Sequence, residues 1–134
     1  MVPPITKQYL DGIALEDFFK PILEDIHSKT FIKTTKRFEC IDFVNPDLDV
    51  ELKTRNYPST DFPSWLLPVC KTIKAEKENK ETYFYYFWKT DKKLFRMKYS
   101  KELFDTFVRE YPFFNPKQEH FYIPANCWEF VGVY

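Results

Sequence analysis

Apolar residues follow two periodicities along this chain, and the change from one to the other marks the predicted elements. Between Ile13 and Ser28 they recur every three or four residues, which predicts an amphipathic helix that Pro21 kinks or restarts. The segment up to Gly12 is expected to be an extended arm or a short helical turn. A first strand is predicted over 30–35.

Two more strands are predicted around a turn in the middle of the chain. The segment Phe38–Val44 is rich in aromatic and β-branched residues, and Val50–Arg55 alternates apolar with polar positions. Between them, residues 45–49 read Asn-Pro-Asp-Leu-Asp, which is the composition of a turn. The pattern therefore predicts a β-hairpin with charged side chains on one of its faces.

The faces of this hairpin decide which charges meet. Side chains alternate between the two faces of a strand, so Glu51, Lys53 and Arg55 share one face. A connection with an even number of residues places Asp42 directly opposite Glu51, whereas an odd number places it opposite Leu52. We expect the even connection, because two carboxylates and a lysine on one face suit a metal site better than they stabilise a sheet.

The second half of the chain shows the same two patterns. A helix capped by Asp61 or Ser64 is predicted, with Ile73 on its buried face. Nearly continuous aromatic residues over Thr82–Trp88 predict a strand that is covered on both faces. The remaining predicted elements are a strand over Leu94–Tyr99, a helix over Lys101–Glu110 and terminal strands over 121–123 and 128–133.

Composition is consistent with one folded domain of mixed class. The chain has 134 residues, of which 20% are aromatic, and this predicts a packed α+β or β-rich domain. Its 20 basic and 20 acidic residues cancel, which argues against tight non-specific binding to nucleic acid. With only two glycines, a glycine-rich phosphate loop is excluded.

The cysteines and the apolar runs bear on the cellular setting. Cys40, Cys70 and Cys127 are widely spaced and odd in number, which argues against a disulfide framework and against a zinc ribbon. We therefore expect an intracellular protein, cytoplasmic or, in a eukaryotic or viral setting, nuclear. The first residues do not have the pattern of a signal peptide, and no apolar run is long enough to span a bilayer.

The hairpin residues resemble those of a known nuclease superfamily. Asp42, followed by Glu51-Leu52-Lys53 on the next strand, is similar to the motif of the PD-(D/E)XK nucleases, which have the restriction-endonuclease-like fold, and in particular to small resolvase-like members. The resemblance implies a single α+β domain in which a mixed central β-sheet with an αβββαβ core, over about 13–99, is flanked by helices, with 100–134 as an elaboration. It also implies hydrolysis of phosphodiester bonds in DNA, or alternatively in RNA.

The same resemblance implies roles for the motif residues. Mg²⁺ or Mn²⁺ would be held by Asp42, Glu51 and the main-chain carbonyl of Leu52, and Lys53 would orient or deprotonate the attacking water. Many members carry a further acid on the first helix, for which Glu16 is the candidate here. The competing interpretation is that Glu51 and Lys53 are ordinary charges on a solvated face and that Glu16 only favours a helix N-terminus.

Three basic residues are candidates for contacts with nucleic acid, and each has a simpler interpretation. Arg55 shares the face of the motif lysine and could clamp a phosphate, or it could be a surface charge. Lys71 and Lys74, one helical turn apart, could contact the nucleic-acid backbone or form a solvated face.

Two other functions stay open at this point. The first is a non-catalytic member of the same fold that binds nucleic acid or protein, which the zero net charge favours. The second is an interaction protein with an aromatic-rich binding surface. A homodimer and a complex with a partner protein are both compatible with the sequence.

A Glu-X-Lys triplet alone is weak evidence for a nuclease motif, because Glu78-Asn79-Lys80 forms another such triplet in this chain.

Overall fold

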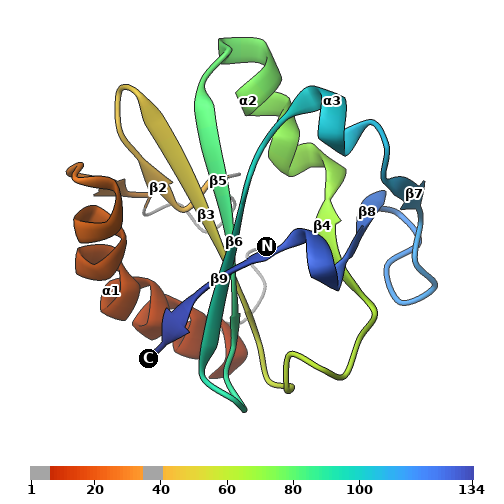
Figure 1. Ribbon diagram of the computed structural model, residues 1–134, viewed down its shortest axis with the longest axis horizontal. Coiled ribbons are helices and arrows are strands. Elements are labelled where there is room, and N and C mark those ends of the chain that lie inside the picture. The colour runs from red at the N-terminus through yellow and green to blue at the C-terminus, as the bar shows by residue number, and fades with distance from the viewer. Residues whose placement is uncertain (1–6, 35–40) are drawn as a thin grey trace, which may run out of the picture.

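The computed structural model describes residues 7–34 and 41–134, and it describes side chains from residue 14 onward. Within these residues the chain forms a mixed six-stranded sheet, a three-stranded sheet and three α-helices (Figure 1). This is the single α+β domain with a mixed central sheet that the sequence predicts.

The six-stranded sheet combines an antiparallel beginning with one parallel pairing. In spatial order its strands are β1 (Ile32–Lys33), β2 (Phe43–Val44), β3 (Leu48–Arg55), β5 (Glu81–Trp88), β6 (Lys93–Lys98) and β9 (Glu129–Val133). The first three strands pair antiparallel, β3 and β5 pair in parallel, and β5, β6 and β9 pair antiparallel again. The parallel pairing requires a crossover between β3 and β5, and this crossover carries much of the second layer.

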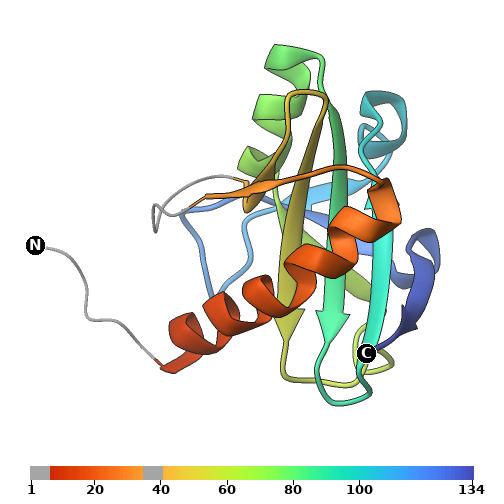
Figure 2. The same cartoon turned by 90° about the vertical axis from the view of Figure 1, so that its left-hand side faces the viewer.

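The two faces of this sheet are covered by different elements. Helix α1 (Lys7–His27) lies across one face, as Figure 2 shows with the helix in front of the strands. The other face is covered by the small sheet, whose order is β4 (Ser64–Pro68), β8 (His120–Pro124) and β7 (Val108–Glu110), and by α2 (Ile73–Glu78) (Figure 1). Short connections complete the layer: η1 (Val69–Thr72), α3 (Lys101–Phe104) and η2 (Ala125–Cys127).

Strand β5 is buried on both faces, as its aromatic run predicts. Tyr85 and Phe87 belong to the core cluster under α1, together with Phe19. Phe84 and Trp88 point to the opposite face and belong to the cluster under the small sheet. A central strand with a core on each side explains why this segment has almost no polar positions.

Helix α1 is longer than the sequence pattern predicts. It begins at Lys7, so the expectation of an extended arm or a short turn before Gly12 is wrong for the described part of that segment. Pro21 lies inside the helix and does not end it. Phe19 and Leu23 are fully buried against the sheet, and this packing outweighs the unfavourable helix propensities of the glycine and the proline.

The helix predicted after Asp61 is wrong at its beginning, because residues 64–68 form strand β4. Trp65 and Leu67 are buried, and the ladder to β8 holds this strand in place. Helical structure starts only at η1, and Ile73, predicted to be buried, is 57% exposed. The apolar residues of this segment fit a helical stripe as well as a strand, and pairing with β8 decides that a strand forms.

The helix predicted over Lys101–Glu110 is also shorter than expected. Ser100 caps α3 by accepting a hydrogen bond from the backbone of Leu103, and the helix ends at Phe104. Residues 108–110 then form β7, which pairs with β8. The small sheet therefore draws both its first and its last strand from segments that look helical in the sequence.

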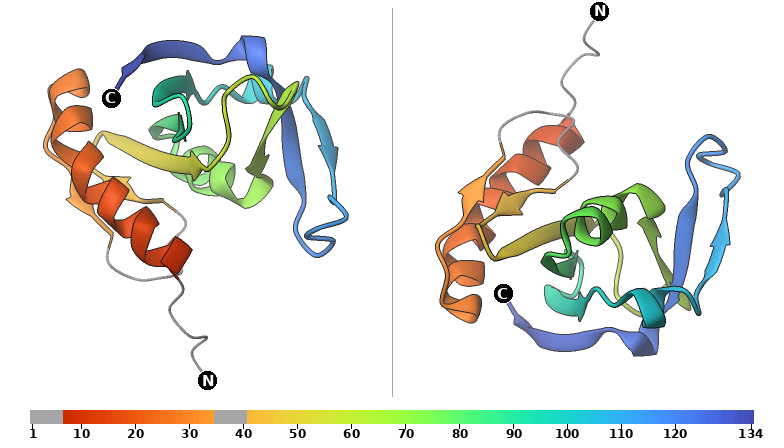
Figure 3. Two further views of the ribbon diagram at one scale, coloured as in Figure 1. Left: turned by 90° about the horizontal axis from the view of Figure 1, so that it is seen from below. Right: turned by 90° about the horizontal axis from the view of Figure 1, so that it is seen from above.

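The end of the chain returns to the first helix. Figure 3 shows the C-terminus beside α1, and the ring of Tyr134 lies 5.7 Å from the ring of Phe19. Cys70 and Cys127 are free thiols, whereas Cys40 lies outside the described residues. Among the helices of the described part, none has both the length and the apolar character needed to cross a membrane.

Candidate active site

The hairpin of β2 and β3 places the two motif acids opposite each other. Phe43 pairs with Val50 and Val44 with Asp49, which leaves residues 45–48, an even number, between the last pair. Continued by one position, this register sets Asp42 opposite Glu51. Of the predicted strand over 38–44, residues 43–44 form β2, while 38–40 lie outside the described residues.

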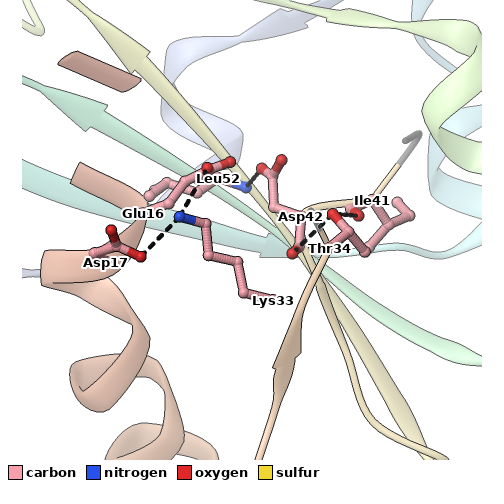
Figure 4. Close-up of polar contacts among 7 residues, drawn as sticks. All are labelled: Glu16, Asp17, Lys33, Thr34, Ile41, Asp42 and Leu52. Carbon is pink, nitrogen blue, oxygen red and sulfur yellow. Dashed lines mark hydrogen bonds and ion pairs between the residues drawn. The ribbon is translucent and has the colours of Figure 1, made fainter. Parts of the chain in front are cut away.

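Asp42 is anchored through its main chain and through its side chain (Figure 4). The backbone N–H of Thr34 donates to its carbonyl oxygen at 2.8 Å, and the backbone N–H of Leu52 donates to its Oδ2 at 2.9 Å. Leu52 lies beyond the last pair of the ladder between β2 and β3, so its N–H is available to the carboxylate. The side chain of Asp42 is therefore fixed at the end of the hairpin before any ligand arrives.

Glu51 is a buried acid next to another acid. Its side chain is 6% exposed. Burial raises the pKa of Glu51 well above its usual range, and the charge of Asp42 raises it further. An acid in this position is stabilised either by a proton or by a cation.

Glu16 adds a third carboxyl group from α1. Burial raises the pKa of Glu16 to about 8, and hydrogen bonding and charge repulsion from Asp42 contribute to the shift. Lys33 Nζ lies 3.8 Å from the Glu16 carboxylate and 2.7 Å from that of Asp17 (Figure 4). The predicted helix acid thus reaches the hairpin, and Asp42 interacts with the carboxyl groups of both Glu16 and Glu51.

Lys53 follows on the same face of β3 and is half-buried. Burial lowers the pKa of Lys53 to about 8, and the positive charge of Arg55 contributes. Glu51, Asp42 and Lys71 also act on its charge, so the lysine belongs electrostatically to the same cluster. The structure thus brings together the acids and the lysine of the predicted motif.

The three basic residues proposed for nucleic-acid contact lie in different surroundings. Lys71 Nζ lies 3.3 Å from Glu51 Oε2, so this residue is part of the acidic cluster and not of a solvated face. Lys74 instead lies 3.0 Å from Asp49. Arg55 places its guanidinium 5.9 Å from the ring centroid of Tyr86 and remains partly exposed.

Asp49 is a buried charge that the sequence pattern did not single out, because its Asn-Pro-Asp-Leu-Asp context resembles a turn. It is completely buried on β3 and pairs with Lys74 at 3.0 Å and with Lys80 at 2.7 Å. Its alternation with Glu51 and Lys53 was the available signal. The two lysines that compensate it arrive from α2 and the turn after it, and hairpin sequence alone cannot reveal them.

The oxygen atoms around Asp42 are of the kind that bind a hard dication. Two carboxylates face each other across the hairpin, and burial, together with interactions with Asp42, raises the pKa values of both Glu16 and Glu51. Mg²⁺ prefers oxygen ligands, takes few of them from protein and keeps several waters. Two carboxylates, the Leu52 carbonyl and a more distant Glu16 fit that preference.

A more complete metal cage is not present in the described part of the chain. Among residues 7–34 and 41–134, no group of three or more His, Cys, Asp or Glu side chains has the arrangement of a metal site. Any ion at this hairpin would therefore be bound by few protein ligands, as Mg²⁺ usually is.

Comparisons with known proteins do not add to this picture. No protein-family model, curated protein or solved structure matches the chain significantly. The function of the protein is therefore inferred from the geometry of the hairpin and its neighbours.

Proposed function

We propose that this protein is a Mg²⁺- or Mn²⁺-dependent nuclease of the PD-(D/E)XK type that hydrolyses phosphodiester bonds in DNA. The observation that carries the proposal is the register of β2 and β3, which sets Asp42 opposite buried Glu51, with Lys53 next on the same face. The order of α1, the antiparallel strands β1–β3, α2 and the parallel strand β5 follows the αβββαβ order of that superfamily, with β4 of the small sheet inserted before α2.

In this proposal Asp42, Glu51 and the Leu52 carbonyl would hold the metal ion, and Glu16 would add a ligand directly or through a water. When bound, the ion lowers the pKa of a coordinated water and neutralises charge that develops on the phosphate. The protein's own contribution is to fix the acids: the Leu52 N–H holds Asp42 at 2.9 Å, and burial limits the movement of Glu51. These acids are then positioned before the substrate binds, which lowers the cost of reorganisation.

Lys53 is the candidate for handling the proton. With its pKa lowered to about 8, its Nζ exchanges a proton more readily near neutral pH than an ordinary lysine does. It can hydrogen-bond the attacking water while charged, and accept a proton when neutral. Arg55, two residues further on the same face, is the candidate for binding the phosphate through its guanidinium.

The second candidate function is a non-catalytic member of the same fold that binds nucleic acid or protein. The observation in its favour is the ion pair of 3.3 Å between Lys71 and Glu51, which already provides a positive charge beside the acid. In a nuclease the metal ion competes with this lysine, or the lysine turns toward the phosphate. In a binding module the ion pair persists, and no metal is needed.

The free thiols bear on the cellular compartment of the protein. Cys70 and Cys127 are free thiols, and Cys127 is exposed, which supports an intracellular, reducing compartment as part of this proposal. The nucleic-acid partner is DNA, and the choice between a monomer, a homodimer and a complex stays a prediction for solution measurements.

The test is a cleavage assay with labelled single-stranded, double-stranded and branched DNA in Mg²⁺ or Mn²⁺. We expect cleavage by the wild type, and its loss in Asp42→Asn and in Lys53→Ala. Matched controls are Asp47→Asn in the exposed turn of the same hairpin and Lys77→Ala on the exposed face of α2, both of which should cleave normally. Undiminished cleavage by the first two variants would refute the assignment of the site, and binding without cleavage would favour the second candidate.

A further inference from the structure

A pocket of about 400 Å³ lies at the end of β3. Its volume falls within the range of small-ligand pockets, about 300–1,000 Å³. Its walls come from the ends of β3 and β5, from β4 and β8, and from the loops before β4 and β8. The residues that matter for the argument are Arg55, Phe62, Trp65, Trp88, Phe114 and His120.

The parallel register of β3 and β5 connects this pocket with the candidate active site. Lys53 is aligned with Tyr86, and Arg55 with Trp88, so each basic residue has a pocket residue beside it on the neighbouring strand. Adjacent strands are only about 4.8 Å apart. The charges of Lys53 and Arg55 also act on His120, another pocket residue. A ligand in the pocket therefore lies next to the lysine of the motif.

The polar groups of the pocket wall come from residues other than its two tryptophans. Trp65 and Trp88 are 3% and 2% exposed, and their indole nitrogens are buried, so these residues contribute apolar ring surface. His120 supplies a hydrogen-bond acceptor, because its Nδ1 donates to the carbonyl of Gln118 at 2.9 Å and leaves Nε2 as the acceptor of the neutral ring.

The rim of the pocket consists of aromatic rings that face solvent. Phe62 is 41% exposed, and its ring is stacked on that of Trp88 at 6.1 Å with an angle of 26° between the planes. Phe114 is 65% exposed. Rings of this kind offer stacking surfaces for a flat aromatic ligand, and Arg55 adds a cation at the same end of β3.

We propose that this pocket binds one unpaired nucleobase of a DNA strand whose adjoining phosphate lies at Asp42, Glu51 and Lys53. The inference rests on the proposed nuclease function and specifies its substrate as DNA with at least one unpaired base next to the cleaved bond. Base edges carry both acceptors and N–H donors, which Arg55 and the Nε2 of His120 complement. A base within a duplex is stacked and paired, so only an unpaired or extruded base can enter.

The zero net charge of the chain is consistent with this substrate. A nuclease that gripped duplex DNA by its phosphates alone would need a basic surface. Stacking of a base on aromatic side chains adds affinity that does not depend on charge and tolerates different base identities.

The test measures binding of the full chain to a fluorescein-labelled 12-nucleotide oligothymidylate by anisotropy, with Ca²⁺ in place of Mg²⁺. We expect Phe114→Ala and Phe62→Ala each to weaken binding about tenfold, the order of a lost base–aromatic contact. Phe113→Ala is the matched control, because Phe113 is 94% exposed and does not line the pocket. Oligonucleotides carrying abasic positions should bind as weakly to the wild type as oligothymidylate binds to Phe114→Ala.

Each outcome separates the pocket from the catalytic proposal. Base-dependent binding without cleavage in Mg²⁺ supports the pocket and refutes the nuclease. Cleavage with equal affinity for abasic and normal strands supports the nuclease and overturns the pocket, as does a Phe113→Ala effect equal to that of Phe114→Ala. Binding of free thymidine monophosphate as tight as that of the oligonucleotide would also overturn it, because the site would then serve free nucleotides.

Discussion

Asp49 and Glu51 are buried acids two residues apart on one face of β3, yet their surroundings differ in the property that matters. Asp49 is paired with two lysines, at 3.0 and 2.7 Å. Glu51 has one lysine at 3.3 Å and also faces the carboxylate of Asp42. The first acid is paired only with cations, whereas the second has an acid as well as lysines beside it.

This difference separates an acid that stabilises the fold from an acid that is ready for a ligand. Burying a charge is tolerated when its partners are close, and removal of one partner then costs several kcal/mol. An acid held next to other acids costs stability in the absence of a cation, and natural proteins keep such arrangements mainly at functional sites. The comparison thus predicts opposite responses to substitution at these two neighbouring positions.

The largest expected effect is on catalysis. Glu51→Gln should lower the cleavage rate about a thousandfold or more, because it removes a metal ligand that supports several kcal/mol of transition-state stabilisation. Single-turnover cleavage of labelled DNA in Mg²⁺ measures this effect. Cleavage by the variant at a rate within a few-fold of the wild type would contradict the functional role of Glu51.

The next effect is on stability and concerns the other acid. Asp49→Ala should lower the free energy of unfolding by about 3 kcal/mol, because it leaves the half-buried Lys74 and Lys80 without their partner. Urea denaturation followed by tryptophan fluorescence measures the loss. As the control, Asp47→Ala removes an exposed partner of Lys29 and should cost about 1 kcal/mol or less. Equal losses in both variants would show that the buried cluster does not stabilise the fold as described.

A third effect distinguishes the two acids by their response to metal. At a concentration of Mn²⁺ about a hundredfold above its dissociation constant, the wild type should gain about 2.7 kcal/mol of stability. Glu51→Gln should lose this gain, while the milder substitution Asp49→Asn should retain it. Thermal unfolding with Mn²⁺ and with EDTA gives the comparison, and a gain that survives in Glu51→Gln would place the ion elsewhere.

The smallest effect depends on pH and concerns Glu16. A carboxyl group with a raised pKa in the folded state favours folding below its unfolded pKa, near 4.5, and this contribution is lost as the pH rises through about 8. In EDTA, Glu16→Gln should therefore be more stable than the wild type at pH 8.5, by about 1 kcal/mol after allowance for its partial exposure, and the advantage should shrink toward pH 5. Melting temperatures across this range test the sign. An advantage that grows as the pH falls would contradict the crowding of the acids.

The sequence predicts the parts of the fold that depend on local pattern. The aromatic run of β5 and the hairpin of β6 with it follow from periodicity and turn composition. Periodicity left two registers open for Asp42, and the structure has the one that sets it opposite Glu51. Glu16 was the candidate for the helix acid that the resemblance implies, and it interacts with Asp42 in the structure.

The parts that the sequence misses depend on contacts between distant segments. Trp65 fits a helical stripe equally well, and only the ladder to β8, more than fifty residues later, makes it part of a strand. Asp49 looks like a turn residue until Lys74 and Lys80 cover it. The pocket likewise combines residues from β3, β4, β5 and β8, so no local sequence motif predicts it.

The most direct test of the central claim is a crystal structure of the wild type with Mn²⁺, in which anomalous scattering locates the ion. We expect one Mn²⁺ bound by carboxylate oxygens of both Asp42 and Glu51, with Lys53 on the same side of the hairpin. A structure in which Mn²⁺ is absent from these acids at millimolar concentration, while Lys71 still holds Glu51, would contradict it.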